Sequence, residues 1–312
     1  MLACAMLLAG CSLRLETAPP VEPTPDAAEI TREAAVVDVL AIRTEATELL
    51  ATEPGDKISA QLERISDFST FQLDALGGVY DSGLTSSTDD LATPEVSATP
   101  QTPTAESLVS DLADVYARSR AALATVPDPD AARLFASIAV SQLMSMRSLA
   151  AAARIDVPDV ETSTTADSAL PAGPADDEVT ALIVGEDALG YSREVLASRL
   201  SDDARSTMYA RAQTNRSRAA AWAGATSVRY SDDDPRQVLY TFPDGVPATT
   251  KALRKRIAVL SMEQAHRVSA ALATVSADDR AAMADLLAAT YLDAITDGAA
   301  RQPLPGLPEF TD

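Results

Sequence analysis

Apolar residues recur every three or four positions over most of the chain, which is the period of an amphipathic α-helix. The stretch 179–200 shows the pattern clearly, because one stripe holds Val179, Leu182, Ile183, Leu189, Leu196 and Leu200. Strand-length runs of β-branched and aromatic residues are scarce, and aromatic residues make up only 4% of the chain. The pattern therefore predicts an all-α fold whose core consists mainly of Ala, Leu and Val.

Start and stop signals divide the first half into four predicted helices, over about 26–51, 57–76, 104–125 and 128–154. Asp26-x-x-Glu29 resembles a capping box, and Asp128-Pro129 combines a good N-cap residue with proline in the first helical position. Pro54-Gly55 and Gly77-Gly78 end the first two helices. Short connections within each pair indicate antiparallel packing.

The second half repeats this plan over about 177–199, 201–224, 247–274 and 276–297. Asp202 and Asp203 provide an acidic first turn for the second of these helices, and Ser276-x-x-Asp279 caps the last one. A loop of roughly twenty residues, which contains the motif 240–243 (YTFP), joins the middle pair. We expect two groups of four helices, split near residue 165, with the second group forming a four-helix bundle.

Segments rich in Ser, Thr, Pro and Asp lie at 81–103 and 158–176, and both are typical of linkers. The predicted organisation is a signal peptide at 1–10, a Pro-rich tether at 11–29 and an N-terminal helical domain at 30–157 that contains the linker 81–103. The linker 158–176, the helical bundle 177–298 and a C-terminal tail at 299–312 follow.

The N-terminus carries a candidate lipid-attachment site. Residues 1–10 (MLACAMLLAG) fit the apolar part of a signal peptide but are too short to span a bilayer. Leu8-Ala9-Gly10-Cys11 resembles the lipobox of bacterial lipoproteins, in which the cysteine becomes the lipid-modified first residue. A Pro-rich tether follows, whereas a buried thiol would need a compact segment around Cys11. The missing basic residues before the apolar run suggest an upstream start codon or a truncation.

Residue counts exclude much chemistry. The net charge of −21 opposes nucleic-acid binding. His266 is the only histidine, and the two cysteines lie within the first eleven residues, so a His/Cys zinc site is excluded and no disulfide is expected after cleavage. No phosphate-binding loop or nucleophile-elbow motif occurs, and no apolar run of 18 residues is found beyond Cys11. We therefore predict no cofactor and no catalytic residue.

Residues from about 179 to 295 resemble the ferritin-like domain of uncharacterised lipoproteins from high-GC Gram-positive bacteria. The resemblance is carried by the motifs 185–191 (GEDALGY), 215–218 (NRSR), 240–243 (YTFP) and 262–264 (MEQ). It implies a ferritin-like four-helix bundle. Members of that family tend to have histidine at the positions of Asp187 and Asn215, so the ligands of an inherited metal site are missing here.

The residues lead to the same conclusion about metal. A ferritin-type di-iron centre needs two Glu-x-x-His motifs, but Glu263 and His266 supply only one. Glu186 lies within the apolar stripe of its helix and points inward, so it needs a partner such as Arg193. A structural hydrogen bond or ion pair is the first interpretation for Glu186, and a helix-surface pair or satisfied polar group for Glu263 and His266. A reduced metal site formed by Glu186, Glu263 and His266 is the alternative.

The basic cluster Lys251, Arg254, Lys255 and Arg256 stands out in an acidic chain and is interpreted as a solvated helix face, or as a contact for an anionic partner or lipid headgroup. Together these patterns predict a lipid-anchored envelope protein outside the cytoplasmic membrane. Its leading function is that of a non-enzymatic component that binds an unidentified protein or small molecule. A metal-dependent oxidase or metal-binding protein of ferritin type is the alternative.

Overall fold

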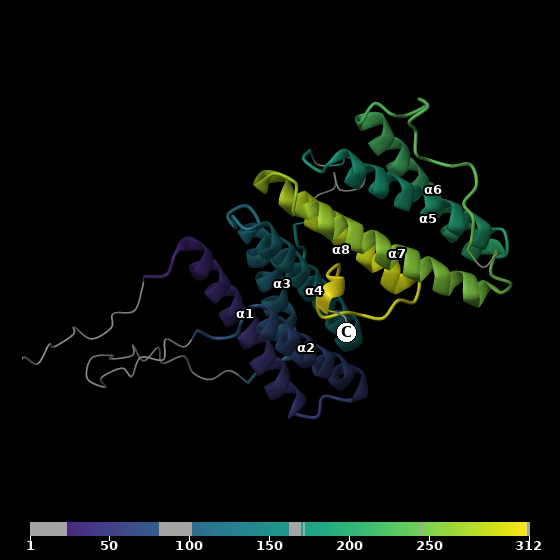
Figure 1. Ribbon diagram of the computed structural model, residues 1–312. Coiled ribbons are helices and arrows are strands. Elements are labelled where there is room, and N and C mark those ends of the chain that lie inside the picture. The colour runs from purple at the N-terminus through teal and green to yellow at the C-terminus, as the bar shows by residue number, and fades with distance from the viewer. Residues whose placement is uncertain (1–23, 81–101, 162–169, 171, 244, 311–312) are drawn as a thin grey trace, which may run out of the picture.

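The computed structural model describes residues 24–80, 102–161, 170, 172–243 and 245–310. Helices account for all the regular structure in these ranges, and no strand occurs there, so the predicted all-α fold class is confirmed. Eight α-helices lie within these ranges (Figure 1): α1 Ala27–Leu50, α2 Asp56–Ala75, α3 Ala105–Ala122, α4 Pro129–Ala153, α5 Asp176–Ala197, α6 Asp202–Ala225, α7 Thr250–Leu272 and α8 Arg280–Thr296. Cys11 and most of the segment 81–103 lie outside the described residues.

Side-chain caps begin three of the first four helices where the sequence predicts them. Asp26, Thr104 and Asp128 each accept a hydrogen bond from the backbone N–H three residues later, at 2.8–3.0 Å. This contact satisfies an amide that has no partner within the helix. The capping box predicted at Asp26 is only half formed, because the Glu29 carboxylate pairs with Arg32 at 2.6 Å instead.

Two predicted starts in the second half are shifted. α7 begins three residues later than expected, because Thr249 is its N-cap and accepts from the Ala252 N–H at 3.1 Å. Near residue 276, the Ser276 hydroxyl bonds to the Asp279 carboxylate, and a 3₁₀ turn at Ala277–Asp279 precedes α8. The loop 226–249 has no regular secondary structure over its described residues, 226–243 and 245–249, as predicted.

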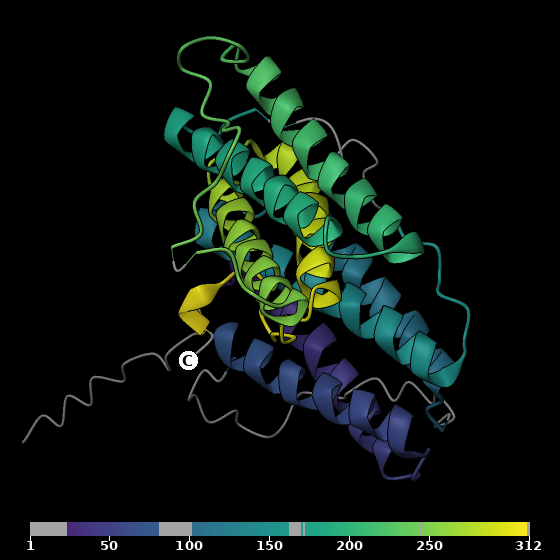
Figure 2. The same ribbon diagram turned by 90° about the vertical axis from the view of Figure 1, so that its right-hand side faces the viewer.

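Successive helices form four hairpins, which stack in the order α1–α2, α3–α4, α7–α8, α5–α6 (Figures 1 and 2). α3 and α4 pack on the first hairpin, α4 also packs on α7 and α8, and α5 packs on α7. α6 packs on α5 at the far end of the stack. The two sequence halves therefore pack together through α4, α7 and α8, a point that the periodicity of single helices left open.

One apolar core joins the two halves. Its buried residues include Leu62, Leu143 and Leu149 from the first half, and Trp222 and Leu287 from the second. α4 is largely buried, and 72% of its most apolar window lies inside the protein. By length and composition α4 is also apolar enough to cross a membrane, which the sequence analysis missed. Its burial against neighbouring helices accounts for this composition.

The C-terminal tail is an ordered part of the fold up to residue 310. The Gln72 side chain donates to the Pro303 carbonyl at 3.0 Å, and the Ser137 hydroxyl donates to the Pro305 carbonyl at 2.8 Å. Leu304 and Leu307 are buried in the shared core. The tail therefore links the first half to α8, the helix that precedes it.

Candidate functional site

A layer of polar side chains crosses the interior of the second half. We call it the polar layer, and it comprises Glu186 and Arg193 of α5, Arg211, Asn215 and Arg218 of α6, Ser261 and Gln264 of α7, and Asp293 and Asp297 at the end of α8. Its three carboxylates face three guanidinium groups. The polar layer is therefore balanced in formal charge by protein side chains alone.

Glu186 is fully buried, as its position in the apolar stripe predicts. Its carboxylate accepts hydrogen bonds from the Asn215 amide at 2.6 Å, the Gln264 amide at 3.2 Å and the Arg218 guanidinium at 3.2 Å. These donors come from two different helices. A buried carboxylate is stable only when its acceptor sites are filled, and here donors fill them.

Arg193 is also fully buried, but it does not pair with Glu186 as the sequence analysis suggested. Its guanidinium binds Asp297 at 2.8 Å and Asp293 at 3.0 Å, and it donates to the side-chain amide oxygen of Asn215. Asn215 therefore connects the two residues, because its amide N–H donates to Glu186 and its amide oxygen accepts from Arg193. The distance between residues 186 and 193 along the helix explains the error, because the two side chains lie two turns apart.

Arg211 completes the polar layer as a second arginine partner of Asp297. It binds the two Asp297 oxygens at 2.7 and 2.9 Å, and Asp293 at 3.1 Å. Asp297 thus accepts from two guanidinium groups while its side chain is only 1% exposed. These contacts tie the outer helix α6 to the end of α8.

The polar layer divides the apolar interior of the second half. A small apolar cluster that includes Leu189, Met208 and Ile257 lies on one side, and the shared core with Ile183 and Trp222 lies on the other. The helices α6 and α7 each change from apolar to polar and back to apolar along the buried stripe, and on α5 the apolar Leu189 lies between the buried Glu186 and Arg193.

Gly185 allows α7 to approach α5 closely enough to build this layer. A Cβ atom at Gly185 would lie 1.9 Å from the Gln264 side-chain oxygen and 3.1 Å from an Arg267 nitrogen. The shorter of these distances is far below van der Waals contact, so any larger residue at position 185 would displace the Gln264 side chain from Glu186. Gly190 has the same role toward α6, where a Cβ would lie 2.8 Å from the Arg216 side chain.

Asp187 faces away from the polar layer and holds the loop 226–249 against α5. It accepts from the Tyr240 hydroxyl at 2.8 Å and from the Gln237 N–H at 3.1 Å, and it pairs with Arg216 at 2.7 Å. Burial and this hydrogen bond raise the pKa of Tyr240 above its usual range. The ring of Tyr191 on α5 packs against the loop, and its centroid lies 5.9 Å from the centroid of the Tyr240 ring.

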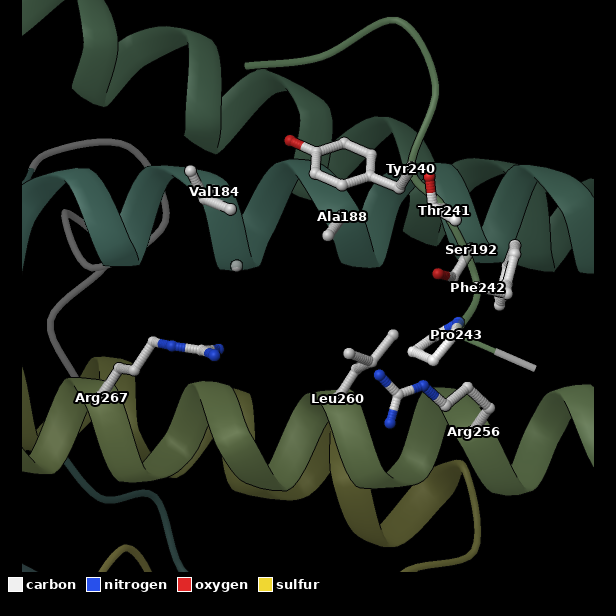
Figure 3. Close-up of a pocket in the computed structure, with 11 residues that line it drawn as sticks. Val184, Ala188, Ser192, Tyr240, Thr241, Phe242, Pro243, Arg256, Leu260 and Arg267 are labelled. Carbon is white, nitrogen blue, oxygen red and sulfur yellow. The ribbon is translucent and has the colours of Figure 1, made fainter. Parts of the chain in front are cut away.

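The anchored loop covers a cavity of about 210 Å³ between α5 and α7. In Figure 3, Tyr240 and Thr241 lie against α5, and Pro243 lies in the gap between the two helices beside Arg256 of α7. Arg267 lies farther along α7, toward the other end of the cavity. Val184, Ala188 and Leu260 provide apolar walls. The motifs singled out in the sequence therefore meet in space: 185–191, 215–218 and 262–264 hold the polar layer and the loop, and 240–243 lines the cavity.

Glu263 and His266 lie outside the polar layer. The Glu263 side chain is 41% exposed and pairs only at long range, 3.9 Å from Arg256 and 3.8 Å from Arg267. His266 is half-buried, desolvation lowers the pKa of its imidazole, and its Nε2 has no hydrogen-bond partner in the described ranges. Glu186, by contrast, faces Gln264, so the structure does not gather the three alternative metal ligands into one site.

No group of three or more His, Cys, Asp or Glu side chains in the described part of the chain is placed to hold a metal ion. Sequence reasoning missed Arg211, Arg218, Asp293 and Asp297 as members of the polar layer. The available signal was their spacing: Arg211, Asn215 and Arg218 recur at four and three residues on α6, so they share one face. Polar residues at that spacing suggest a solvated face, and only the packing of α6 shows that they are covered.

The fold and the site define an all-α protein of stacked helical hairpins, with a charge-balanced polar layer and an arginine-lined cavity in its second half. Comparisons with protein-family models, curated proteins and solved structures found no match.

Proposed function

We propose that this protein is a lipid-anchored, extracytoplasmic component of the cell envelope that binds a partner or ligand without catalysis. In this proposal its second half is a degenerate ferritin-like bundle in which charge-paired side chains occupy the interior. The observation that supports the proposal most strongly is the polar layer. Its carboxylates already accept from guanidinium and amide donors of neighbouring helices.

The chemistry of that donor set favours binding without metal over a di-metal oxidase. A di-metal site needs carboxylates and histidines that converge on a shared space and remain free to coordinate. Here Arg218, Asn215 and Gln264 approach Glu186 with hydrogen-bond donors, which would repel a cation. Glu263 and His266, the only Glu-x-x-His pair, lie on either side of Gln264 in the sequence of α7 but outside the polar layer.

The envelope location rests on the sequence of the N-terminus. Leu8-Ala9-Gly10-Cys11 supplies the lipobox, and the Pro-rich segment that follows suits a tether between a membrane anchor and the first described helix. A single lipid-modified cysteine at this position would place the helical stack close to the outer face of the membrane. The acidic charge of the chain opposes binding to a nucleic acid.

Detergent partition tests the anchor. The full chain is expressed in a bacterium that processes lipoproteins, and wild type is compared with Cys11→Ala. We expect wild type in the detergent phase with its mature N-terminus at Cys11, and the variant unprocessed or released. Wild-type protein found entirely in the soluble cytoplasmic fraction, with residues 1–10 retained, would refute the anchor.

Metal analysis separates the two functions. We expect purified wild-type protein to contain iron and manganese far below one equivalent per chain. Stoichiometric iron or manganese that is lost in Glu263→Ala would instead establish the metal-binding alternative.

A further inference from the structure

We propose that the cavity between α5 and α7 binds a small organic carboxylate with a short alkyl chain, and that Arg256 and Arg267 recognise the carboxylate. This inference rests on the proposed binding function and names the ligand class of the same half of the molecule.

The two arginines differ from the other arginines around them. Arg193, Arg211 and Arg218 of the polar layer all bind carboxylates at 2.7–3.2 Å. Arg256 forms no hydrogen bond in the described ranges, and Arg267 has one of 3.5 Å to the Gln264 side chain. A guanidinium group has five N–H donors, so most donors of both side chains remain available for a ligand.

One carboxylate of the chain, that of Glu263, already lies between the two guanidinium groups. The two oxygens of Glu263 lie 3.9 Å from an Arg256 nitrogen and 3.8 Å from an Arg267 nitrogen. Both distances exceed those of charge-assisted hydrogen bonds, which are about 2.7–2.9 Å. The Glu263 side chain is also 41% exposed and does not line the cavity, so a carboxylate inside the cavity would compete with it for the two guanidinium groups.

The walls of the cavity select for an apolar group behind the charge. Val184 and Ala188 of α5 and Leu260 of α7 line it together with the loop residues Phe242 and Pro243 (Figure 3). The cavity has a volume of about 210 Å³ and is partly open to solvent, so a short alkyl chain can enter it. This size suits a molecule of about eight non-hydrogen atoms, such as hexanoate.

Local charge favours an anion at this place, although the whole chain carries −21. Lys251, Arg254 and Lys255 precede Arg256 on the first two turns of α7, and no acidic residue lies in the first turn of that helix. The helix N-terminus adds its own positive potential near these side chains. The basic cluster noted in the sequence therefore attracts anions toward the cavity.

Calorimetric titration of the full chain carrying Cys11→Ser, which has no lipid, tests the inference with four probes. We expect hexanoate to bind with a Kd on the order of 1 mM or below. We expect hexanol, which lacks the charge, acetate, which lacks the chain, and inorganic phosphate to bind at least tenfold more weakly. Hexanol equal to hexanoate, phosphate equal to hexanoate, or no hexanoate binding would each overturn the proposal.

Variants locate the site. Arg256→Gln and Arg267→Gln should each weaken hexanoate binding about tenfold, because each removes a charged hydrogen-bond donor. Arg43→Gln on α1 is the matched control, because it removes the same charge at a partly exposed arginine that lies outside both the cavity and the basic cluster, and it should change Kd less than twofold. An equal effect of all three variants would overturn the site.

Two further variants should change the affinity for hexanoate in opposite directions. Glu263→Gln removes the competing carboxylate and should tighten hexanoate binding several-fold. Ala188→Leu fills the cavity and should abolish binding while circular dichroism shows an intact fold; unchanged binding would refute this location. A chain that is anchored through Cys11 but does not bind hexanoate would refute this inference and leave the anchor standing.

Discussion

Replacement of Glu186 tests the polar layer most directly. The groups around its carboxylate are all donors: the Asn215 amide, the Gln264 amide and the Arg218 guanidinium. Glu186→Leu removes every acceptor and leaves these donors facing a methyl group. Glu186→Gln keeps one acceptor oxygen but points its NH₂ group at other donors. Asn215 cannot rotate to help, because its own oxygen already accepts from Arg193.

The expected magnitudes follow from this geometry. Loss of one partner from a buried ion pair costs about 3–5 kcal/mol, and this is the expected loss in unfolding free energy for Glu186→Leu. One mismatched buried donor costs about 1–3 kcal/mol, which is the expected loss for Glu186→Gln. At roughly 2–4 °C per kcal/mol, the Leu variant should melt about 6–20 °C below wild type.

The assay is urea unfolding of wild type and both variants, followed by far-UV circular dichroism. Glu63, which is exposed in the middle of α2, supplies the matched control, and Glu63→Leu and Glu63→Gln should stay within about 0.5 kcal/mol of wild type. A Glu186→Leu variant as stable as Glu63→Leu, or a Gln variant as unstable as the Leu variant, would refute the argument.

Three further predictions concern the tail, pH and metal. Gly306→Ala should destabilise the protein by about 2 kcal/mol or more in the same urea assay, because φ is +83° and a Cβ would lie 2.8 Å from the Ser269 Cβ; an unchanged midpoint would refute the packing of the tail. Burial raises the pKa of Glu45 from 4.5 to about 7, with Asp111 adding to the effect. Because the folded-state pKa lies above the unfolded value, the stabilisation is complete below pH 4.5 and is lost as the pH rises through about 7. Between pH 4.5 and 7, Glu45→Gln should therefore lose less thermal stability than wild type, and parallel melting curves would contradict this. Addition of EDTA should leave the melting temperature unchanged, because guanidinium and amide donors already bind the buried carboxylates; a reproducible drop of several degrees would show that a metal stabilises the bundle.

The sequence alone located the helices to within about four residues, and the starts of α7 and α8 were among its largest errors. Asp26, Thr104 and Asp128 begin their helices because a side-chain cap acts on the next turn of the same chain, and this contact needs no tertiary structure. The inward orientation of Glu186 followed in the same way, since the residue lies between Ile183 and Leu189 on one stripe. Both inferences depend only on interactions within a few residues.

The partners of Glu186 and the position of the cavity were decided by the tertiary structure. Periodicity shows which face of a helix is buried, but not which residues of another helix lie opposite, because that depends on the rotation and the offset of both helices. Gly185 sets this offset for α5 and α7, where the missing Cβ allows Gln264 to reach Glu186. The arginine-lined cavity similarly required the loop 226–249 to fold back onto α5, through a hydrogen bond between residues 187 and 240 that no local pattern encodes.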